Sequence, residues 1–155
     1  MRSFSNADEA HAYGIEVEAT ALLNQYLSAG AAWSWNQTSY DEFASTDANA
    51  CALGPLAQGN SDDPLCTEKQ NLEGNSFPLT PEHKFSLWAS AQWEWQWAQM
   101  SASVSYMYVG DQYMSPFNLD EYDKVKAWDR WDSQLSASYG PWSMTAFVKN
   151  IADER

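Results

Sequence analysis

Apolar and polar residues alternate along most of this chain. In the run at residues 12–21, Tyr13, Ile15 and Val17 share one parity, while polar or small residues occupy the other. A period of two residues is typical of a β-strand with one apolar face. Similar runs follow at residues 27–38, 83–97, 100–108, 131–139 and 142–148. The pattern therefore predicts an all-β, antiparallel chain with six strands.

Short and long connections alternate between these runs. Short turns are predicted at residues 22–25, 98–99 and 140–141, whereas residues 40–82 and 111–127 are long polar segments. Strands of about 10 to 14 residues span about 33 to 46 Å, which exceeds the length of an ordinary globular strand. Such strands suit a tilted crossing of a bilayer. We therefore expect long loops at one end of the strands and tight turns at the other.

The composition of the two parities indicates which surface each strand face meets. The polar parity holds mostly Ser, Thr, Gln, Gly and Asn, with few of the charges that a water-facing exterior carries. Rings on the apolar parity gather near strand ends, where membrane proteins place aromatic belts. The alternative is a soluble, lipocalin-like barrel with these rings in its core. The predicted lipid-interface aromatics are Trp33, Trp35, Trp93, Trp95, Trp97 and Trp142.

Charge and composition exclude several classes of protein. The 155 residues include 21 acidic and 8 basic side chains, which gives a net charge of −13. That balance excludes a nucleic-acid binder that works by phosphate neutralisation, so no nucleic-acid partner is expected. An aromatic content of 15% argues against a disordered acidic chain. No run approaches 18 consecutive apolar residues, so no transmembrane helix is predicted.

Four segments, in order along the chain, carry a family resemblance. Residues 6–18 (NADEAHAYGIEVE), 77–84 (FPLTPEHK), 108–113 (YVGDQY) and 147–155 (FVKNIADER) resemble strand and strand-edge motifs of TonB-dependent outer-membrane receptors. The resemblance implies a transmembrane β-barrel of about 22 strands with a plugged lumen. Residues 1–155 are then expected to form one partial barrel domain near the C-terminal end of that barrel. The plug, the earlier strands and the last strand are expected to be absent from it.

The same resemblance implies a function. It predicts energy-coupled import of a scarce ligand, such as a ferric siderophore or another iron complex, across the outer membrane of a Gram-negative bacterium. The expected partners are outer-membrane lipid, the rest of the barrel, its plug, TonB through the missing N-terminal part, and the ligand. No cofactor is expected. A passive porin-like or structural barrel segment is the main alternative, because it shares the alternation and the aromatic belts.

An enzyme is not expected. No Ser-His-Asp arrangement, HExxH motif or phosphate-binding glycine loop is present. His11 and His83 both lie at strand beginnings, which favours polar strand-end roles over catalysis or iron binding. Glu16 and Glu18 share one face, where contact with the plug or water is more plausible than a catalytic pair.

The two long loops hold the remaining candidate residues. In the family's orientation these loops face an oxidising exterior, so Cys51 and Cys66 are a candidate disulfide, with free thiols as the alternative. Residues 41–73 carry seven carboxylates against one lysine. This excess of negative charge predicts a solvated loop, and Ca²⁺ binding by the carboxylates is the alternative. The loop aromatics that could contact a ligand at the barrel mouth are Tyr113, Phe117 and Tyr122.

Overall fold

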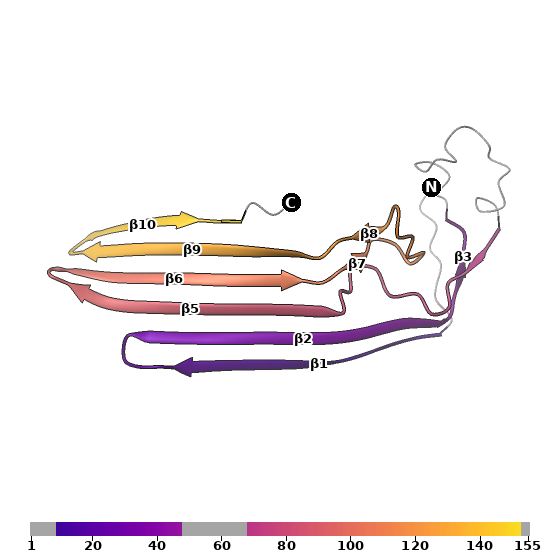
Figure 1. Ribbon diagram of the computed structural model, residues 1–155, viewed down its shortest axis with the longest axis horizontal. Helices are drawn as coiled ribbons and strands as arrows, with labels where there is room; N and C mark the ends of the chain where they lie inside the picture. The colour runs from indigo at the N-terminus through magenta and orange to yellow at the C-terminus, as the bar shows by residue number, and fades with distance from the viewer. Residues whose placement is uncertain (1–8, 48–67, 153–155) are drawn as a thin grey trace, which may run out of the picture. The chain divides into compact units, whose positions relative to one another are not determined.

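The computed structural model describes residues 9–47 and 68–152 and is all-β across them (Figure 1). No helix in these two ranges is long and apolar enough to cross a membrane. The strands are β1 (Glu9–Leu22), β2 (Leu27–Glu42), β3 (Ala44–Ser45), β4 (Gln70–Asn71), β5 (His83–Trp95), β6 (Ala98–Val109), β7 (Gln112–Tyr113), β8 (Lys124–Val125), β9 (Trp128–Tyr139) and β10 (Trp142–Val148).

The chain divides into two compact units. The strand unit comprises residues 15–35, 82–111 and 126–155, and the loop unit comprises residues 1–14, 36–81 and 112–125. Each unit is considered by itself. The six long strands form one sheet in the order β1-β2-β5-β6-β9-β10, which is the neighbour order of successive hairpins.

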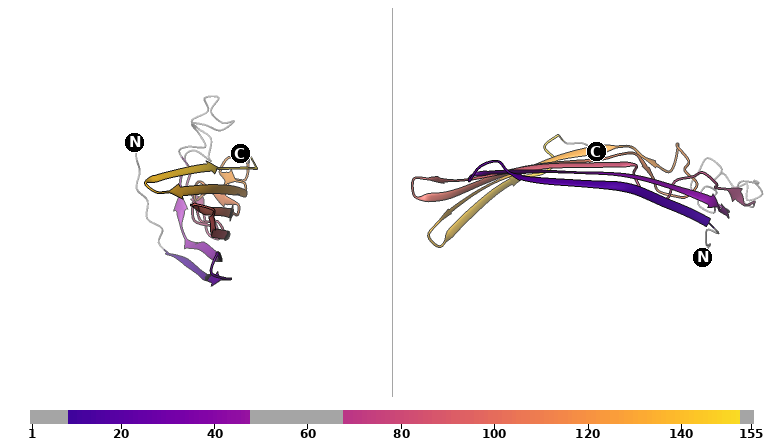
Figure 2. Two further views of the ribbon diagram at one scale, coloured as in Figure 1. Left: turned by 90° about the vertical axis from the view of Figure 1, so that its left-hand side faces the viewer. Right: turned by 90° about the horizontal axis from the view of Figure 1, so that it is seen from below.

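The strand unit confirms the six predicted strands and their antiparallel order. β1 neighbours β2, and antiparallel ladders join β2 to β5, β5 to β6, β6 to β9 and β9 to β10. In Figure 2 these strands are seen from two further sides, and the β9–β10 hairpin diverges from the β5–β6 hairpin toward the turns. The sheet is therefore one layer whose hairpins splay at their turn ends.

Several predicted strand boundaries were wrong; β1 and β9, for example, each begin three residues before the predicted start. The turn expected at residues 98–99 lies at Gln96 and Trp97, and Ala98 already belongs to β6. Gln96 has φ 57°, the left-handed region that a tight hairpin turn requires. β2 continues to Glu42, beyond the predicted end at residue 38, since backbone pairing does not depend on apolar side chains.

The register of the paired strands places their apolar side chains on one face of the sheet. Ala29 lies opposite Ala89, which lies opposite Val104, and the rows above and below follow the same rule. Trp88 breaks the alternation, as Met107 and Phe147 do, and projects from the polar face, directly opposite Gly30. A Cβ atom on Gly30 would lie 2.5 Å from Nε1 of Trp88, so the indole occupies the space that any larger residue would need.

The loop unit has a small core of its own. Phe43, Leu72 and Pro81 are buried, and the Tyr40 ring lies 4.8 Å from the rings of both Phe43 and Phe77. The β3–β4 pair brings Ala44 beside Asn71, and the amide of Leu72 donates to the Phe43 carbonyl. The predicted long loops therefore contain packed structure in their described parts.

Hydrogen bonds tie the two described loop segments together. Asn118 accepts from the Ser76 amide at 2.7 Å and donates to the Ser76 carbonyl at 3.0 Å. Asn75 donates to the Pro116 carbonyl at 2.9 Å, and the Leu79 amide donates to the Tyr113 carbonyl at 2.8 Å. These contacts join residues about forty positions apart in the sequence into one unit.

Candidate functional site

Two rows of rings cross the apolar face of the strand unit. The row near the loop ends of the strands, called here the loop-side row, consists of Trp33, Trp35, Phe85, Tyr106 and Trp131. Its rings pack on each other: Tyr106 lies 4.7 Å from Trp131 and 6.3 Å from Phe85. Trp33 stacks on His83 at 6.1 Å, and Trp35 donates from Nε1 to Glu82 at 3.0 Å. This row therefore combines packed apolar rings with polar contacts at one edge.

The second row lies at the turn ends of the same strands and is called here the turn-side row. It consists of Trp93, Trp95, Trp97, Tyr139 and Trp142. Trp97 and Tyr139 meet edge to face at 4.7 Å and so join the β5–β6 turn to the β9–β10 turn. Trp142 is 78% exposed and Trp97 is 67% exposed, whereas Trp33 and Trp131 in the loop-side row are 40% and 41% exposed. The turn-side rings other than Trp93, which is 37% exposed, are thus more open than those two loop-side rings.

The spacing of the two rows matches a bilayer. Phe85 and Trp93 are eight positions apart on β5, which corresponds to about 26 Å along the strand. A tilt of about 40° reduces this to about 20 Å along the membrane normal, close to the apolar band of about 25 Å in outer-membrane barrels. Between the rows this face carries mostly alanine, valine, leucine and methionine, including Ala31, Ala91 and Leu135, with Ser133 as a polar residue among them.

The opposite face is lined by small hydroxyl side chains. Ser28 and Ser90 are hydrogen-bonded at 2.8 Å, Ser136 and Thr145 at 2.9 Å, and Ser138 donates to Ser143 at 3.3 Å. These cross-strand pairs satisfy one another along the ladder, so the face stays polar without carrying many charges.

Charges on the polar face gather toward the loop ends of the strands. Glu16, Glu18 and Lys84 border a shallow hollow of about 290 Å³. Arg130 and Asp132 form an ion pair at 3.1 Å on the same face, and Asp132 also accepts from the amide of Asn150 at 3.0 Å. Most charges of the polar face therefore lie near its loop ends, and Glu94 lies near the turns.

The three predicted ligand-contacting aromatics lie on one hairpin loop of the loop unit. Tyr113 is held by its hydroxyl, which donates to Asp120 at 2.8 Å, and Lys124 lies 6.0 Å from the centre of its ring. Phe117 is half-buried, with its amide donating to Ser115 Oγ at 3.2 Å. Tyr122 is 51% exposed. Tyr122 is therefore the member of the three whose ring is most open to a ligand.

The local environment of Tyr122 raises the pKa of its hydroxyl. Desolvation raises this pKa above the usual value of about 10, and the charge of Glu121 and a hydrogen bond to it raise the pKa further. Like an ordinary tyrosine hydroxyl, the phenol is protonated at physiological pH and can both donate and accept hydrogen bonds.

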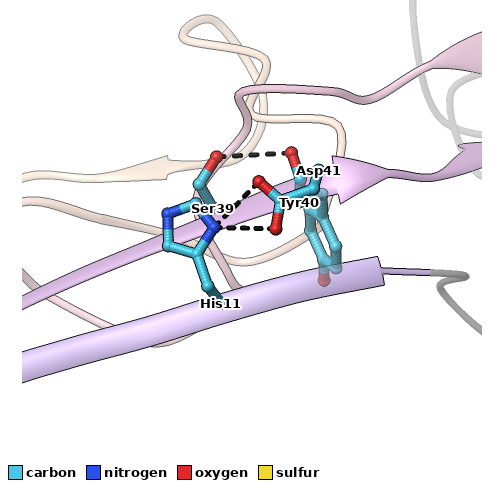
Figure 3. Close-up of polar contacts among 4 residues, drawn as sticks. All are labelled: His11, Ser39, Tyr40 and Asp41. Carbon is cyan, nitrogen blue, oxygen red and sulfur yellow. Dashed lines mark hydrogen bonds and ion pairs between the residues drawn. The ribbon is translucent and has the colours of Figure 1, made fainter.

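A polar pair that the sequence did not predict joins β1 and β2 in the loop unit (Figure 3). Nδ1 of His11 lies 2.8 Å from both carboxylate oxygens of Asp41, and the His11 ring stacks on Tyr13 at 5.9 Å. Tyr13 in turn donates to Gln37 at 2.7 Å. Ser39 Oγ donates instead to the Tyr40 carbonyl at 3.3 Å. The cluster therefore orients an imidazole without giving it a nucleophile.

Several predicted loop features lie outside the described residues. Cys51 and Cys66 both do, as do Asp62 and Asp63, so the disulfide and part of the acidic cluster remain predictions. Within residues 9–47 and 68–152, no three His, Cys, Asp or Glu side chains are grouped to hold a metal ion.

Comparison of the sequence with known protein families identifies the kind of protein that carries these two faces. A family model described as "TonB dependent receptor-like, beta-barrel" matches residues 2–151. The chain belongs to this family. No curated protein and no solved structure gives a significant match. The family is one of receptors and transporters in the Gram-negative outer membrane, so the six-stranded sheet is a segment of a transmembrane barrel and its long strands are the membrane-crossing elements.

Proposed function

We propose that this chain forms part of the wall of a TonB-dependent receptor that imports a ferric siderophore or another iron complex. The observation that carries the proposal is the two-faced sheet. One face is apolar between two rows of rings, and the other is lined with serine and carries most of its charges near the loop ends. A wall between lipid and a wet, plugged lumen needs these two surfaces.

In this proposal the apolar face meets lipid. The six interface tryptophans then lie at two levels, with Trp33 and Trp35 near the loop ends and Trp93, Trp95, Trp97 and Trp142 near the turns. The indole and phenol rings have one apolar body and one polar edge, which suits the boundary between hydrocarbon and water. The hydrogen bond from Trp35 to Glu82 is an example of that polar edge in use.

The loop unit is proposed to receive the ligand. Tyr122 supplies an exposed ring for contact, whereas Tyr113 and Phe117 shape the loop from half-buried positions. Cys51 and Cys66 are proposed to form a disulfide within the preceding loop. In the chain-entropy model, such a bridge over about 15 residues contributes about 3 kcal/mol to the stability of that loop.

The partners follow from the same proposal. The rest of the barrel pairs with the two edge strands of the sheet, and a plug contacts the polar face. Release of the ligand into the periplasm depends on TonB acting through the N-terminal part of the receptor. A passive porin-like barrel is the second candidate, since its wall needs the same two faces.

Uptake measurements separate these candidates. The receptor that contains this segment is expressed in cells with and without TonB, and uptake of radioactive iron is measured with a panel of siderophores. Import that requires TonB and that saturates with one class of complex supports the proposal. Uptake independent of TonB supports the porin. Import of a ligand without iron keeps the receptor assignment and rejects the siderophore.

The orientation of the faces has its own test. Cysteines are introduced at the neighbouring positions Ala91 and Ser90, in a receptor whose native cysteines are serine, and are treated with a charged maleimide. Ser90→Cys on the polar face is expected to react from water, and Ala91→Cys is expected to be protected by lipid. The reverse pattern would overturn the assignment.

A further inference from the structure

An aromatic hollow of about 520 Å³ opens on the apolar face at the turn ends of two hairpins. Trp95 and Trp97 border it on the β5–β6 side, Tyr139 and Trp142 border it on the β9–β10 side, and the small side chains of Ala98 and Ala137 leave the space between them. The hairpins diverge at this end of the sheet (Figure 2), which agrees with a hollow between their turns.

The rings around this hollow do not fill it. Trp95, Trp97 and Trp142 are 63%, 67% and 78% exposed. In the loop-side row, by contrast, successive rings pack on each other across three strands. The edge-to-face contact between Trp97 and Tyr139 links the two turns, so the hollow has a defined border on that side. Trp97 and Tyr139 therefore close one border of the hollow, while the largely exposed rings of Trp95 and Trp142 leave its interior open.

The residues that line the hollow favour an apolar ligand that makes few polar contacts. No charged side chain borders the hollow, and the polar groups are those of Gln96, Ser138 and Ser143. A hydrocarbon chain meets these requirements. In a membrane, such a chain gains no hydrophobic free energy over bulk lipid, so selectivity comes from van der Waals packing against preorganised surfaces. Aromatic rings provide large contact areas of this kind.

We infer that this hollow binds one acyl chain of a glycerophospholipid from the leaflet on the side of the short turns. The inference rests on the proposed orientation of the apolar face toward lipid. The hollow is continuous with that face, and Met100 and Met144 extend its apolar lining toward the centre of the sheet. A second protein is the poorer fit, because a specific protein interface buries at least about 1,200 Å² in total and this hollow is confined to two turns.

Photolabelling of the receptor tests the inference. The receptor that contains this segment is reconstituted in phosphatidylethanolamine vesicles with a small fraction of an analogue that carries a diazirine in one acyl chain. After irradiation, labelled peptides are identified by mass spectrometry. Label is expected to concentrate on residues 95–100 and 137–144, above the level on residues 85–91 of the same face.

Two matched variants sharpen the result. Ala137→Trp fills the hollow and is expected to remove most of the label there, whereas Ala102→Trp adds the same ring to the same face outside the hollow and is expected to leave the label in place. A heat-modifiability assay on gels confirms that both variants are folded. Equal labelling of both variants, or crosslinks to a protein instead of lipid, would overturn the inference.

The outcome also separates this inference from the proposed orientation. Label spread evenly along the apolar face, with little on the polar face, rejects the hollow and keeps the orientation. Label on the polar face in preference to residues 85–91 rejects the orientation, and the inferred lipid site with it.

Discussion

The loop unit and the strand unit differ most in where their side chains are buried. Phe43, Leu72, Pro81 and Asp47 are buried in the described part of the loop unit, whereas Val109 is the buried side chain in that of the strand unit. The strand unit nevertheless contains β5, β6, β9 and β10, the larger part of β1 and β2, and all nine tryptophans. Among the described residues, most buried side chains therefore lie in segments whose sequence is polar, and few lie in the alternating strands.

The difference shows that the two units depend on different stabilising interactions. The loop unit is held by its own packed rings and by cross-loop hydrogen bonds. The strand unit relies on its ladders, with both faces left for surroundings that lie outside the chain: lipid on one side and the barrel interior on the other, in the proposed orientation. A substitution in the loop unit should therefore disturb packing within the protein. A substitution in the strand unit should instead disturb contact with lipid or with the barrel interior.

The largest effect is expected from removing the loop core. Phe43→Ala removes a ring that is 7% exposed and in contact with Tyr40 at 4.8 Å, which should cost the loop unit about 3 to 5 kcal/mol. Hydrogen exchange of the intact receptor in vesicles should show faster exchange at residues 70–81 with the β5–β6 ladder unchanged. Leu79→Ala, at a side chain that is 61% exposed, is the matched control. Slower or unchanged exchange in Phe43→Ala contradicts an independent core.

The next largest effect is expected from a charge placed on the apolar face of the strand unit. Ala89→Arg places a charge midway between the two rows of rings, where outer-membrane barrels lose about 2 to 4 kcal/mol. Ser103→Arg puts the same side chain at a similar depth on the polar face and should cost much less. The midpoints of guanidinium unfolding in vesicles measure both. Equal losses would mean that neither face meets lipid.

The strands could be predicted from the sequence because alternation is a local signal. Residues two positions apart share a face whatever their partners, so the parity of Trp33, Phe85 and Trp131 could be assigned from the chain alone. The turn at Gln96 and Trp97 was missed, because Trp97 continues the apolar parity beyond the end of β5. Conformation at a turn depends on φ, which the alternation does not encode.

The loop unit and the hollow could not be predicted in the same way. The contact between Ser76 and Asn118 spans 42 positions of chain, and nothing in either segment's composition selects the other. The pairing of His11 with Asp41 needs the register of β1 on β2, which two alternating runs leave open. The hollow lies where two hairpins splay around the small side chains of Ala98 and Ala137, and the splay depends on the twist of the whole sheet, which local alternation does not encode.

A smaller effect is expected at Gly30, which lies against Trp88, a residue that breaks the alternation. Gly30→Ala forces a methyl group against the Trp88 indole, 2.5 Å from its Nε1, and overpacking of this kind costs about 1 to 3 kcal/mol. The double variant Gly30→Ala with Trp88→Leu should recover most of the loss in the same unfolding assay. Additive losses in the double variant would show that the close approach is not the cause.

Loss of one cross-loop connection should have a smaller effect still. Asn118→Gly keeps the positive φ of 51° available but removes the side chain that bonds to Ser76, at a cost of about 1 kcal/mol. Asn118→Ala should cost more, since alanine is strained at that φ. Hydrogen exchange at the Ser76 amide reports both variants. If alanine and glycine behave alike, backbone strain plays no part at this position.

The smallest effect is spectroscopic and concerns the ring proposed to touch the ligand. Desolvation, with the adjacent Glu121 carboxylate, raises the pKa of Tyr122, so its phenol should ionise later than free tyrosine as the pH rises. The ultraviolet difference between the receptor and Tyr122→Phe isolates that titration. Glu121→Gln removes the charge and should shift the transition to lower pH without abolishing the part due to desolvation. Because Tyr122 is an exposed residue of the loop unit, the same titration repeated with bound ligand reports contact directly: a ligand that covers the ring should move the transition to higher pH, and an unmoved transition would exclude Tyr122 from the site.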